Sequence, residues 1–428
     1  MTTLGHRPLV HFAAQQGWIN DPIGLAKHGD TYRMFSQYIP GAAAWAPECS
    51  WLQLTSDDGV RWHQMGTVLE PGEGDDGVWS GSLVVDDHGE AHMFYTSVSS
   101  ENIHIGRVRV AHAADADWSE WHKGDVVVTC PEGDDVVVFR DPYVVRDGTG
   151  WRMVVGGGRR DGTAVAYQWV SEDLENWAFR GVLAERNGSE RSPTDGSVWT
   201  GTVWECPQLI QVDGAWVLVV AVWEPTVAHY TAYSVGVIES DVFTGSPWRR
   251  LTYGPSYYAG SAFSAEGLGT GLIYWLRNTR GTAWTGAHSV PHILHRVGDR
   301  VCSTFSGVFA DRRSEEVRLD GGEMDRPAVI DVVWSPEEAD VVEFGTDDDG
   351  WLVRLEIGGE SLCASSAGER WEMPWPGGTI RVLSDTGVVE ILTEDSAMAL
   401  PLPVSADLRR PKLLGQGTAR AWIIDVSG

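Results

Sequence analysis

The sequence predicts an all-β protein in two parts, a five-bladed β-propeller followed by a C-terminal β-sandwich. Short strand-like runs dominate the chain, and a weak repeat of about 60 residues extends through most of it. The C-terminal part then changes to a strict alternation of apolar and polar residues. We expect the propeller in residues 1–312 and the sandwich in residues 313–428.

The strand-like runs are separated by clusters of Gly, Asp, Asn and Pro, which is typical of many hairpins. Almost no stretch spaces its apolar residues as a helix does. The glycines at 156–158 are expected in a hairpin turn and not in a phosphate loop, because no helix pattern follows them. The clearest runs are YRMFSQY (32–38), GSLVVDD (81–87), AHMFYTS (91–97), DVVVTC (125–130), WRMVVGGG (151–158), AWVLVVAVW (215–223) and TGLIYWL (270–276).

The repeat combines an acidic turn, a tryptophan and a short strand. Clear copies cover residues 56–71, 171–185 and 239–255, and a looser one covers 114–128. The aligned tryptophans are Trp62, Trp121, Trp177 and Trp248, spaced 59, 56 and 71 residues apart. A period of about 60 residues accommodates four antiparallel strands, and five such units of a propeller occupy roughly 300 residues.

The C-terminal part alternates apolar and polar residues in 340–357, 380–395 and 419–426, which favours a β-sandwich. The acidic, proline-containing stretch 311–337 is the expected linker.

Charge and composition exclude several classes of function. Lysine and arginine number 32 against 60 acidic residues in 428, so the formal charge is −28 and a nucleic-acid or membrane-surface role is disfavoured. Five scattered cysteines predict no disulfide framework. No signal peptide or long apolar span is visible, so a cytoplasmic protein is expected. The 22 tryptophans indicate stacking surfaces or a repeated core position.

Three carboxylates have unusual neighbours. Asp21 lies in WINDPIG (18–24), Asp141 in FRDPYV (139–144) and Glu205 in VWECPQL (203–209). A single Asp-Pro most simply opens a turn. Three such carboxylates, each beside aromatic residues or arginine and one or two repeat units apart, favour convergence at one mouth of a propeller. Two converging carboxylates are the minimum for glycoside cleavage.

These three motifs, in this order, resemble the signature motifs of the β-fructofuranosidases of glycoside hydrolase family 32, which are invertases, fructan hydrolases and fructosyltransferases. The resemblance implies a five-bladed propeller followed by a sandwich, in agreement with the repeat. Further segments resemble the family in the same order: QYIPGAAAW (37–45), VWSGS (78–82), SEDLENW (171–177), YGPSYYAGSAF (253–263), LIYWLRN (272–278), GTAWTGAHSVPHIL (281–294) and IRVLSDTGVVEILTED (380–395).

The resemblance also implies roles for the carboxylates. Asp21 would be the nucleophile, and Glu205 the general acid and then base, with a raised pKa helped by the flanking Trp204 and Cys206. Asp141 would hold fructose hydroxyls beside Arg140. The expected substrate-binding residues are Arg140, side chains that offer amide or hydroxyl hydrogen bonds, and aromatic side chains that wall the pocket. The alternative for the tryptophans is a place in the core of a blade. Besides Arg140, the residues are Asn20, Gln37, Ser80, Trp45, Trp79, Trp275 and Tyr258.

Some residues depart from the family pattern. Ile23 and Ile39 stand where the family has asparagine, and Gln53 stands at an expected histidine. We interpret Ile23 and Ile39 as polar rim residues that have become apolar, so that a short fructan fits as well as sucrose does.

The prediction is a retaining β-fructofuranosidase that acts on sucrose or short fructo-oligosaccharides, with a carbohydrate partner, no cofactor and no metal. His288, His292 and His295 resemble metal spacing, but on a strand His295 points away from the other two. Whether the protein forms a homo-oligomer stays open. The alternatives are a fructosyltransferase with the same trio, a related five-bladed glycosidase for arabinose-containing chains, and a sugar-binding protein without catalysis.

Overall fold

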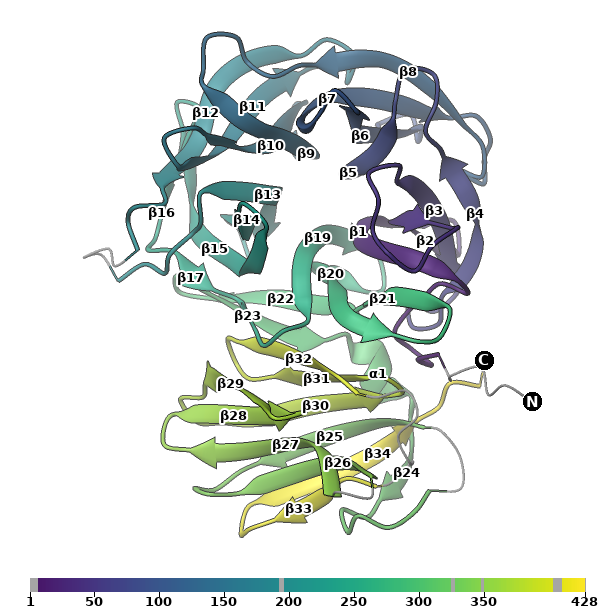
Figure 1. Ribbon diagram of the computed structural model, residues 1–428, viewed down its shortest axis with the longest axis vertical. Coiled ribbons are helices and arrows are strands. Elements are labelled where there is room, and N and C mark those ends of the chain that lie inside the picture. The colour runs from purple at the N-terminus through teal and green to yellow at the C-terminus, as the bar shows by residue number, and fades with distance from the viewer. Residues whose placement is uncertain (1–6, 192–195, 325–327, 348–349, 403–409, 428) are drawn as a thin grey trace.

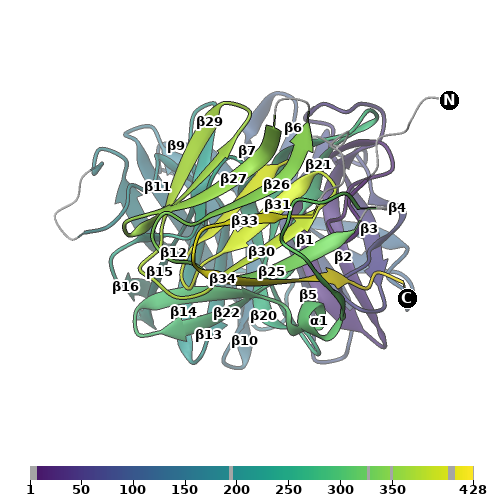
Figure 2. The same ribbon diagram turned by 90° about the horizontal axis from the view of Figure 1, so that it is seen from below.

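The computed structural model describes residues 7–191, 196–324, 328–347, 350–402 and 410–427. The regular secondary structure of these residues is almost entirely β-strand, as predicted, and it includes a single short helix, α1 (Gly307–Asp311). Figure 1 shows the strands of the N-terminal part arranged in a ring, with the C-terminal strands layered below it. Figure 2 views the same layers from below, with the ring behind them. Within the described residues, no helix has the length and apolar character needed to span a membrane.

The ring consists of antiparallel meanders whose strands follow one another in sequence. The first contains β1 (Gly17–His28), β2 (Thr31–Ile39), β3 (Ser50–Ser56) and β4 (His63–Leu69). The second contains β5 (Gly77–Val85), β6 (Ala91–Ser99), β7 (Asn102–Ala113) and β8 (Trp121–Val128). The third contains β9 (Val136–Asp147), β10 (Gly150–Arg159), β11 (Thr163–Ser171) and β12 (Ala178–Asn187).

The rest of the ring follows the same plan. One meander contains β13 (Val203–Val212), β14 (Ala215–Glu224), β15 (Val227–Glu239), β16 (Val242–Gly245) and β17 (Arg249–Arg250). The last contains β19 (Tyr257–Ala265), β20 (Gly269–Arg280), β21 (Trp284–His288), β22 (His292–Val297) and β23 (Arg300–Phe305). Strand β21 pairs in parallel with β1, with Gly17 opposite Trp284, so the last meander meets the first.

The tryptophan repeat corresponds to one position in the meanders, before or at the start of an outer strand. Trp62 precedes β4, Trp121 begins β8, and Trp177 precedes β12. The turns before Trp62 and Trp177 have the same hydrogen bonds: the hydroxyls of Ser56 and Ser171 accept from the backbone N–H three residues later. The sequence repeat therefore follows from a repeated turn.

The glycines at 156–158 lie within strand β10, so the prediction of a hairpin turn is wrong. A Cβ atom on Gly156 would come within 2.3 Å of the carbonyl oxygen of Trp204 in β13. A Cβ atom on Gly158 would meet Thr202 and Val203 at 2.7 Å or less. The glycines are required because two meanders approach each other closely here, which local sequence does not reveal.

The C-terminal part forms two sheets that pack face to face, as the alternation predicts. Their shared core includes Val332, Trp334, Phe344 and Leu355. One sheet contains β18 (Thr252–Tyr253), β32 (Ala397–Pro401), β31 (Val388–Leu392), β30 (Ile380–Asp385), β25 (Val329–Ser335), β34 (Thr418–Ile424) and β24 (Arg313–Val317). The other contains β29 (Glu369–Pro374), β28 (Ser361–Ser366), β27 (Gly350–Gly358), β26 (Val341–Asp347) and β33 (Lys412–Leu414).

The two parts are joined more closely than a linker would join them. Strand β18 comes from the ring sequence but pairs with β32 of the sandwich. A single apolar cluster contains ring residues such as Tyr274 and sandwich residues such as Leu383. The expectation of a linker at 311–337 is wrong in its described residues, because β24 and β25 both pair with β34 there.

Candidate active site

The first strand of each meander is interrupted where a predicted site residue lies. In β1, the pairing with β2 shifts between Ile19 and Pro22, around Asp21. Strand β9 is irregular around Asp141, and β13 shifts between Glu205 and Gln208. Proline has no N–H to donate to the ladder, so the proline that follows each carboxylate favours a bulge. The bulge re-aims the carboxylate out of the regular alternation of the strand.

Two further inner strands show the same irregularity. Strand β5 shifts between Trp79 and Gly81, which frees Ser80, and β19 shifts just after Tyr258. Asp141 and Cys206 have positive φ angles of 67° and 44°, values that side chains other than glycine rarely adopt. Such backbone conformations concentrate at functional sites, where the surrounding structure holds them in place.

The carboxylate of Asp21 accepts several hydrogen bonds. The Asn20 amide donates to its Oδ1 at 3.1 Å, and the Gln37 amide donates to its Oδ2 at 3.3 Å. The Ser80 hydroxyl also donates to Oδ2. Of the residues predicted around Asp21, these three converge on it from β1, β2 and β5.

Asp141 lies next to Asp21 through a shared neighbour, Cys206. The Cys206 sulfur lies 3.6 Å from Oδ2 of both carboxylates, and its backbone N–H donates to Asp141 at 3.0 Å. The backbone N–H of Asp141 donates in turn to the Thr96 hydroxyl at 2.8 Å. Asp141 is only 5% exposed, so this carboxylate is held at the bottom of the site.

Glu205 has polar partners on both oxygens. The Arg140 guanidinium donates to Oε1 at 2.6 and 3.2 Å, and the Tyr258 hydroxyl donates to Oε2. The apolar setting expected from Trp204 and Cys206 is therefore wrong. Trp204 points into the core between two meanders, whereas Cys206 faces the aspartates, because the bulge that follows Glu205 breaks the regular alternation of β13.

Burial and like charge raise the pKa of both aspartates. Burial raises the pKa of Asp21 to about 6, and the Glu205 charge adds to the rise while the Ser80 hydrogen bond opposes it. Burial also raises the pKa of Asp141 to about 7, against the opposing effect of Arg140. A single guanidinium thus lies among three carboxylates, and protonation near neutral pH relieves their repulsion.

Aromatic side chains surround the arginine. The Arg140 guanidinium lies 5.7 Å from the ring centre of Trp79 and 5.2 Å from that of Trp223. Trp45 packs edge-on against Trp79 and is 46% exposed, so it belongs to the rim rather than the core. Trp275 packs edge-on against Trp18.

A small pocket opens between the bulges. Its lining includes Asp21, Ser80, Asp141 and Cys206, together with the main chain of residues 259–261 in β19. The sequence reasoning did not place Thr96 or Trp223 in the site, and it gave Cys206 only as an apolar neighbour of Glu205. Cys206 had a local signal, because it lies inside the Glu-Cys-Pro motif, whereas Thr96 and Trp223 lie in segments with no distinctive pattern.

The departures from the family pattern lie mostly away from the pocket. Ile23 is 1% exposed and packs in the core with Phe35 and Trp51, so its interpretation as a rim residue is wrong. Gln53 is buried and donates to the carbonyls of residues 117 and 118. Only Ile39 packs near the site, in the apolar cluster of Trp79.

The three histidines set aside as a metal site do not converge. Nε2 of His288 bonds the carbonyl oxygen of Asn20 at 2.9 Å and thereby supports the bulge of β1. His292 pairs with Glu390 of the sandwich, and His295 is exposed.

Comparison with known proteins shows the family to which this chain belongs. The sequence profile described as "Glycosyl hydrolases family 32 N-terminal domain" matches residues 11–302, so the chain belongs to glycoside hydrolase family 32. Sucrose-6-phosphate hydrolase of Escherichia coli is 31% identical over 63% of this chain and 57% of that protein. Raffinose invertase of Escherichia coli is 28% identical over 69% of this chain and 63% of that protein. The chain thus spans about three-fifths of the length of these relatives.

Solved structures of the family have the same fold. A β-fructofuranosidase of Bombyx mori superposes with a TM-score of 0.82 at 21% identity, covering 98% of this chain and 94% of that one. Fructan 1-exohydrolase IIa of Cichorium intybus superposes with a TM-score of 0.81 at 18% identity, covering 99% and 98%.

Proposed function

We propose that this chain is a retaining β-fructofuranosidase, which hydrolyses terminal β-D-fructosyl bonds of sucrose or short fructo-oligosaccharides. The observation that carries the proposal is that Asp21 and Asp141 line one pocket of a family 32 chain, while Glu205 lies beside them and shares Arg140 with Asp141. Two carboxylates, one that attacks and one that delivers a proton, suffice for this reaction with net retention.

In the first step, a carboxylate oxygen of Asp21 attacks the anomeric carbon of the fructosyl group. The bond from that carbon to the leaving oxygen breaks, and Glu205 gives its proton to this oxygen. The hydrogen bonds from Asn20, Gln37 and Ser80 hold Asp21 in one orientation before the attack.

In the second step, water attacks the fructosyl–Asp21 ester. Glu205, now a carboxylate, takes the proton from this water, and Asp21 leaves as a carboxylate. Arg140 and Tyr258 hold Glu205 for both proton transfers. Asp141 accepts hydrogen bonds from fructose hydroxyls and supports the positive charge of the transition state.

Two unsatisfied donors next to the carboxylates and Cys206 support a sugar ligand. Nη1 of Arg140 and Nε1 of Trp275 are buried, and no described residue is bonded to either of them. Unpaired buried donors are costly, and the hydroxyls of a bound sugar would pair with both. Trp45 and Trp79 supply the apolar surface on which the C–H faces of sugars pack.

The rest of the prediction follows the family. We propose that the meanders of the ring are five blades, with the domain boundary at residues 312 and 313, because β24 is the first strand after α1 to join a sandwich sheet. The names of the relatives favour small sucrose-like substrates over polymers. The cytoplasmic location and the oligomeric state stay predictions.

The experiment is sugar release from sucrose, 1-kestose, levanbiose and inulin, with products separated by chromatography. We expect the wild type to release fructose, and the Asp21→Ala and Glu205→Ala variants to release almost none. Growth of longer oligosaccharides at high sucrose would reassign the chain as a fructosyltransferase. If the folded wild type turned over none of these sugars, the proposal would be wrong, and either a glycosidase for a different furanoside or a binding protein would remain.

A further inference from the structure

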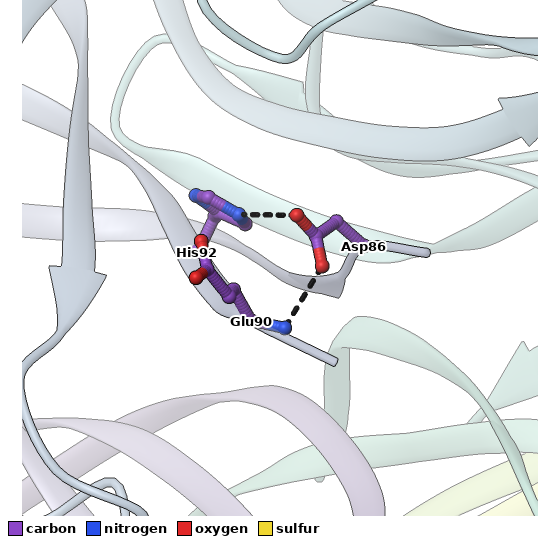
Figure 3. Close-up of side chains that lie close together, drawn as sticks. All are labelled: Asp86, Glu90 and His92. Carbon is purple, nitrogen blue, oxygen red and sulfur yellow. Dashed lines mark hydrogen bonds and ion pairs between the residues drawn. The ribbon is translucent and has the colours of Figure 1, made fainter. Parts of the chain in front are cut away.

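A group of metal-ligating side chains lies on the second meander, away from the active site. It is formed by Asp86, Glu90 and His92 in the hairpin that joins β5 to β6, and Figure 3 shows the three side chains together. Asp86 follows Ser80 by six residues, which is roughly 20 Å along an extended strand. The group therefore plays no part in the chemistry proposed above.

The turn orients the Asp86 carboxylate. Its Oδ1 accepts the backbone N–H groups of His88 at 2.9 Å and Glu90 at 2.8 Å. Its Oδ2 faces Nε2 of His92 at 3.6 Å, beyond hydrogen-bond distance. One ligand atom from each of Asp86, Glu90 and His92 lies within 4.8 Å of the others. A cation between them would contact all three after small side-chain movements.

His92 is the member that points to a ligand. It is 9% exposed, and its Nε2 is buried without a hydrogen-bond partner in the described structure. A buried ring nitrogen without a hydrogen bond is costly, and this one has only the Asp86 carboxylate at ion-pair distance, 3.6 Å away.

The neighbouring strand holds the ring in a suitable orientation. Nδ1 of His92 lies 3.1 Å from Nδ1 of His112, which is its directly paired residue in β7. When His112 accepts, His92 carries its proton on Nδ1 and presents a lone pair on Nε2. Metal-ligating histidines are usually fixed in this way by a bond at the other nitrogen.

We propose that Asp86, Glu90 and His92 bind one divalent transition-metal cation, for which Zn²⁺ is the probe. An imidazole with two carboxylates suits zinc-like cations, whereas Mg²⁺ and Ca²⁺ prefer oxygen ligands alone. Zinc binds nitrogen and oxygen at about 2.0–2.2 Å with four ligands, so water would complete the coordination on the exposed side of Glu90. The bound cation would fasten the turn to β6 and stabilise this meander.

The test is calorimetric titration of the metal-free full-length protein with ZnCl₂, accompanied by thermal unfolding. We expect one strong site with a Kd on the order of 10 µM or tighter, and a rise in Tm with zinc. His92→Gln and Glu90→Gln should each weaken this site at least about tenfold. His88→Ala is the matched control, because His88 lies exposed in the same turn outside the group.

Equal zinc binding by the wild type and both variants would overturn the proposal, and so would loss of the site in His88→Ala. Glu90 is exposed, so Glu90→Gln keeps the test valid if His92→Gln does not fold. Failure of fructosidase activity would leave this result unaffected, because the readouts are heat of binding and Tm.

Discussion

Two buried groups of acidic residues in this protein have the same chemistry and opposite electrostatics. In the active site, three carboxylates share one close cation, Arg140, and the pKa values of Asp21 and Asp141 are raised. At the contact between ring and sandwich, Asp385 and Glu390 are paired with His11 and His292.

The second group, which we call the interface network, is closely bonded. Glu390 contacts Nε2 of His11 at 2.6 Å and Nε2 of His292 at 2.8 Å. Asp385 contacts Nδ1 of His11 at 3.0 Å. Burial alone would lower the pKa of His11, but the bonds to Asp385 and Glu390 outweigh it and raise this pKa to about 9. Burial would raise the pKa of Glu390, but the two histidines hold it well below its usual range.

The comparison teaches that the number of cationic partners per carboxylate, rather than burial alone, decides whether a buried carboxylate stabilises or destabilises the fold. The interface network supplies a cationic or hydrogen-bonding partner for each carboxylate, so its charges stabilise the fold. The active site gives its three carboxylates hydrogen bonds but only one close cation, so ionising Asp21 and Asp141 destabilises the fold.

The largest effect is expected from Asp21→Asn in the active site. The variant keeps the shape of the side chain but cannot attack the sugar, so kcat should fall at least about 10⁴-fold. Steady-state fructose release from sucrose or 1-kestose measures this. Asp30→Asn, an exposed change in the turn after β1, is the control and should keep full activity. Retention of more than a few per cent of activity by Asp21→Asn would contradict the assignment of the nucleophile.

The interface network should respond in stability rather than activity. Glu390→Gln removes the charged partner of His292 and one of the two charged partners of His11, so we expect a loss of about 3–5 kcal/mol in the free energy of unfolding. The contribution of Glu390 is present above its usual pKa of 4.5 and is lost as the pH falls through its lowered value. That of His11 is present below 6.5 and is lost as the pH rises through about 9.

The difference in the free energy of unfolding between the wild type and Glu390→Gln should therefore be greatest between about pH 4.5 and 6.5. It should become smaller above pH 9. Urea unfolding at a series of pH values measures it, with exposed Glu394→Gln in the next turn as the control. A deficit that did not change across this range would show that the network acts through packing alone.

Asp141→Asn sharpens the comparison, because its effect on stability should have the opposite sign. The raised pKa of Asp141 means that its favourable contribution is present below 3.8 and lost as the pH rises through about 7. Asparagine does not ionise, so the variant avoids the cost of a buried charge but also loses the attraction to Arg140. The balance should make the variant more stable than the wild type by about 1–3 kcal/mol at pH 8. The gain should vanish near pH 4. Destabilisation at pH 8 would contradict the account of the active site.

The smallest effect concerns the pH dependence of catalysis. Asp21 must be ionised to attack, so kcat/KM should fall below about pH 6 in the wild type. The Ser80 hydroxyl lowers this pKa, so Ser80→Ala should move the acidic limb upward by about one pH unit. Exposed Ser264→Ala on β19 should leave the limb in place. A downward shift in Ser80→Ala would reverse the sign expected here.

Much of the fold was predictable from local patterns. The predicted runs all lie in or across strands, and the tryptophan repeat predicts the turn before an outer strand because the same hydrogen bonds recur there. The prolines after Asp21, Asp141 and Glu205 are also a local signal, because each proline interrupts the hydrogen-bond ladder of its strand at a bulge.

The remaining features depend on contacts between distant segments. His11 and Glu390 are 379 residues apart, and the local sequence around each gives no sign that the two side chains pair. Gly156 is required by the carbonyl of Trp204 on another meander, and Ile23 is turned into the core by the bulge at Asp21. Single-sequence reasoning detects periodicity and turn chemistry but not which faces meet after folding.

The most direct test of the central claim is to trap the covalent intermediate. Glu205→Ala should be mixed with β-fructosyl fluoride, whose leaving group needs no proton, and analysed by mass spectrometry after acid quench. Because the variant lacks the base for the second step, we predict one fructosyl group attached to the peptide that contains Asp21. No adduct while the fluoride is consumed, or an adduct on Asp141, would contradict the assignment of Asp21 as the nucleophile.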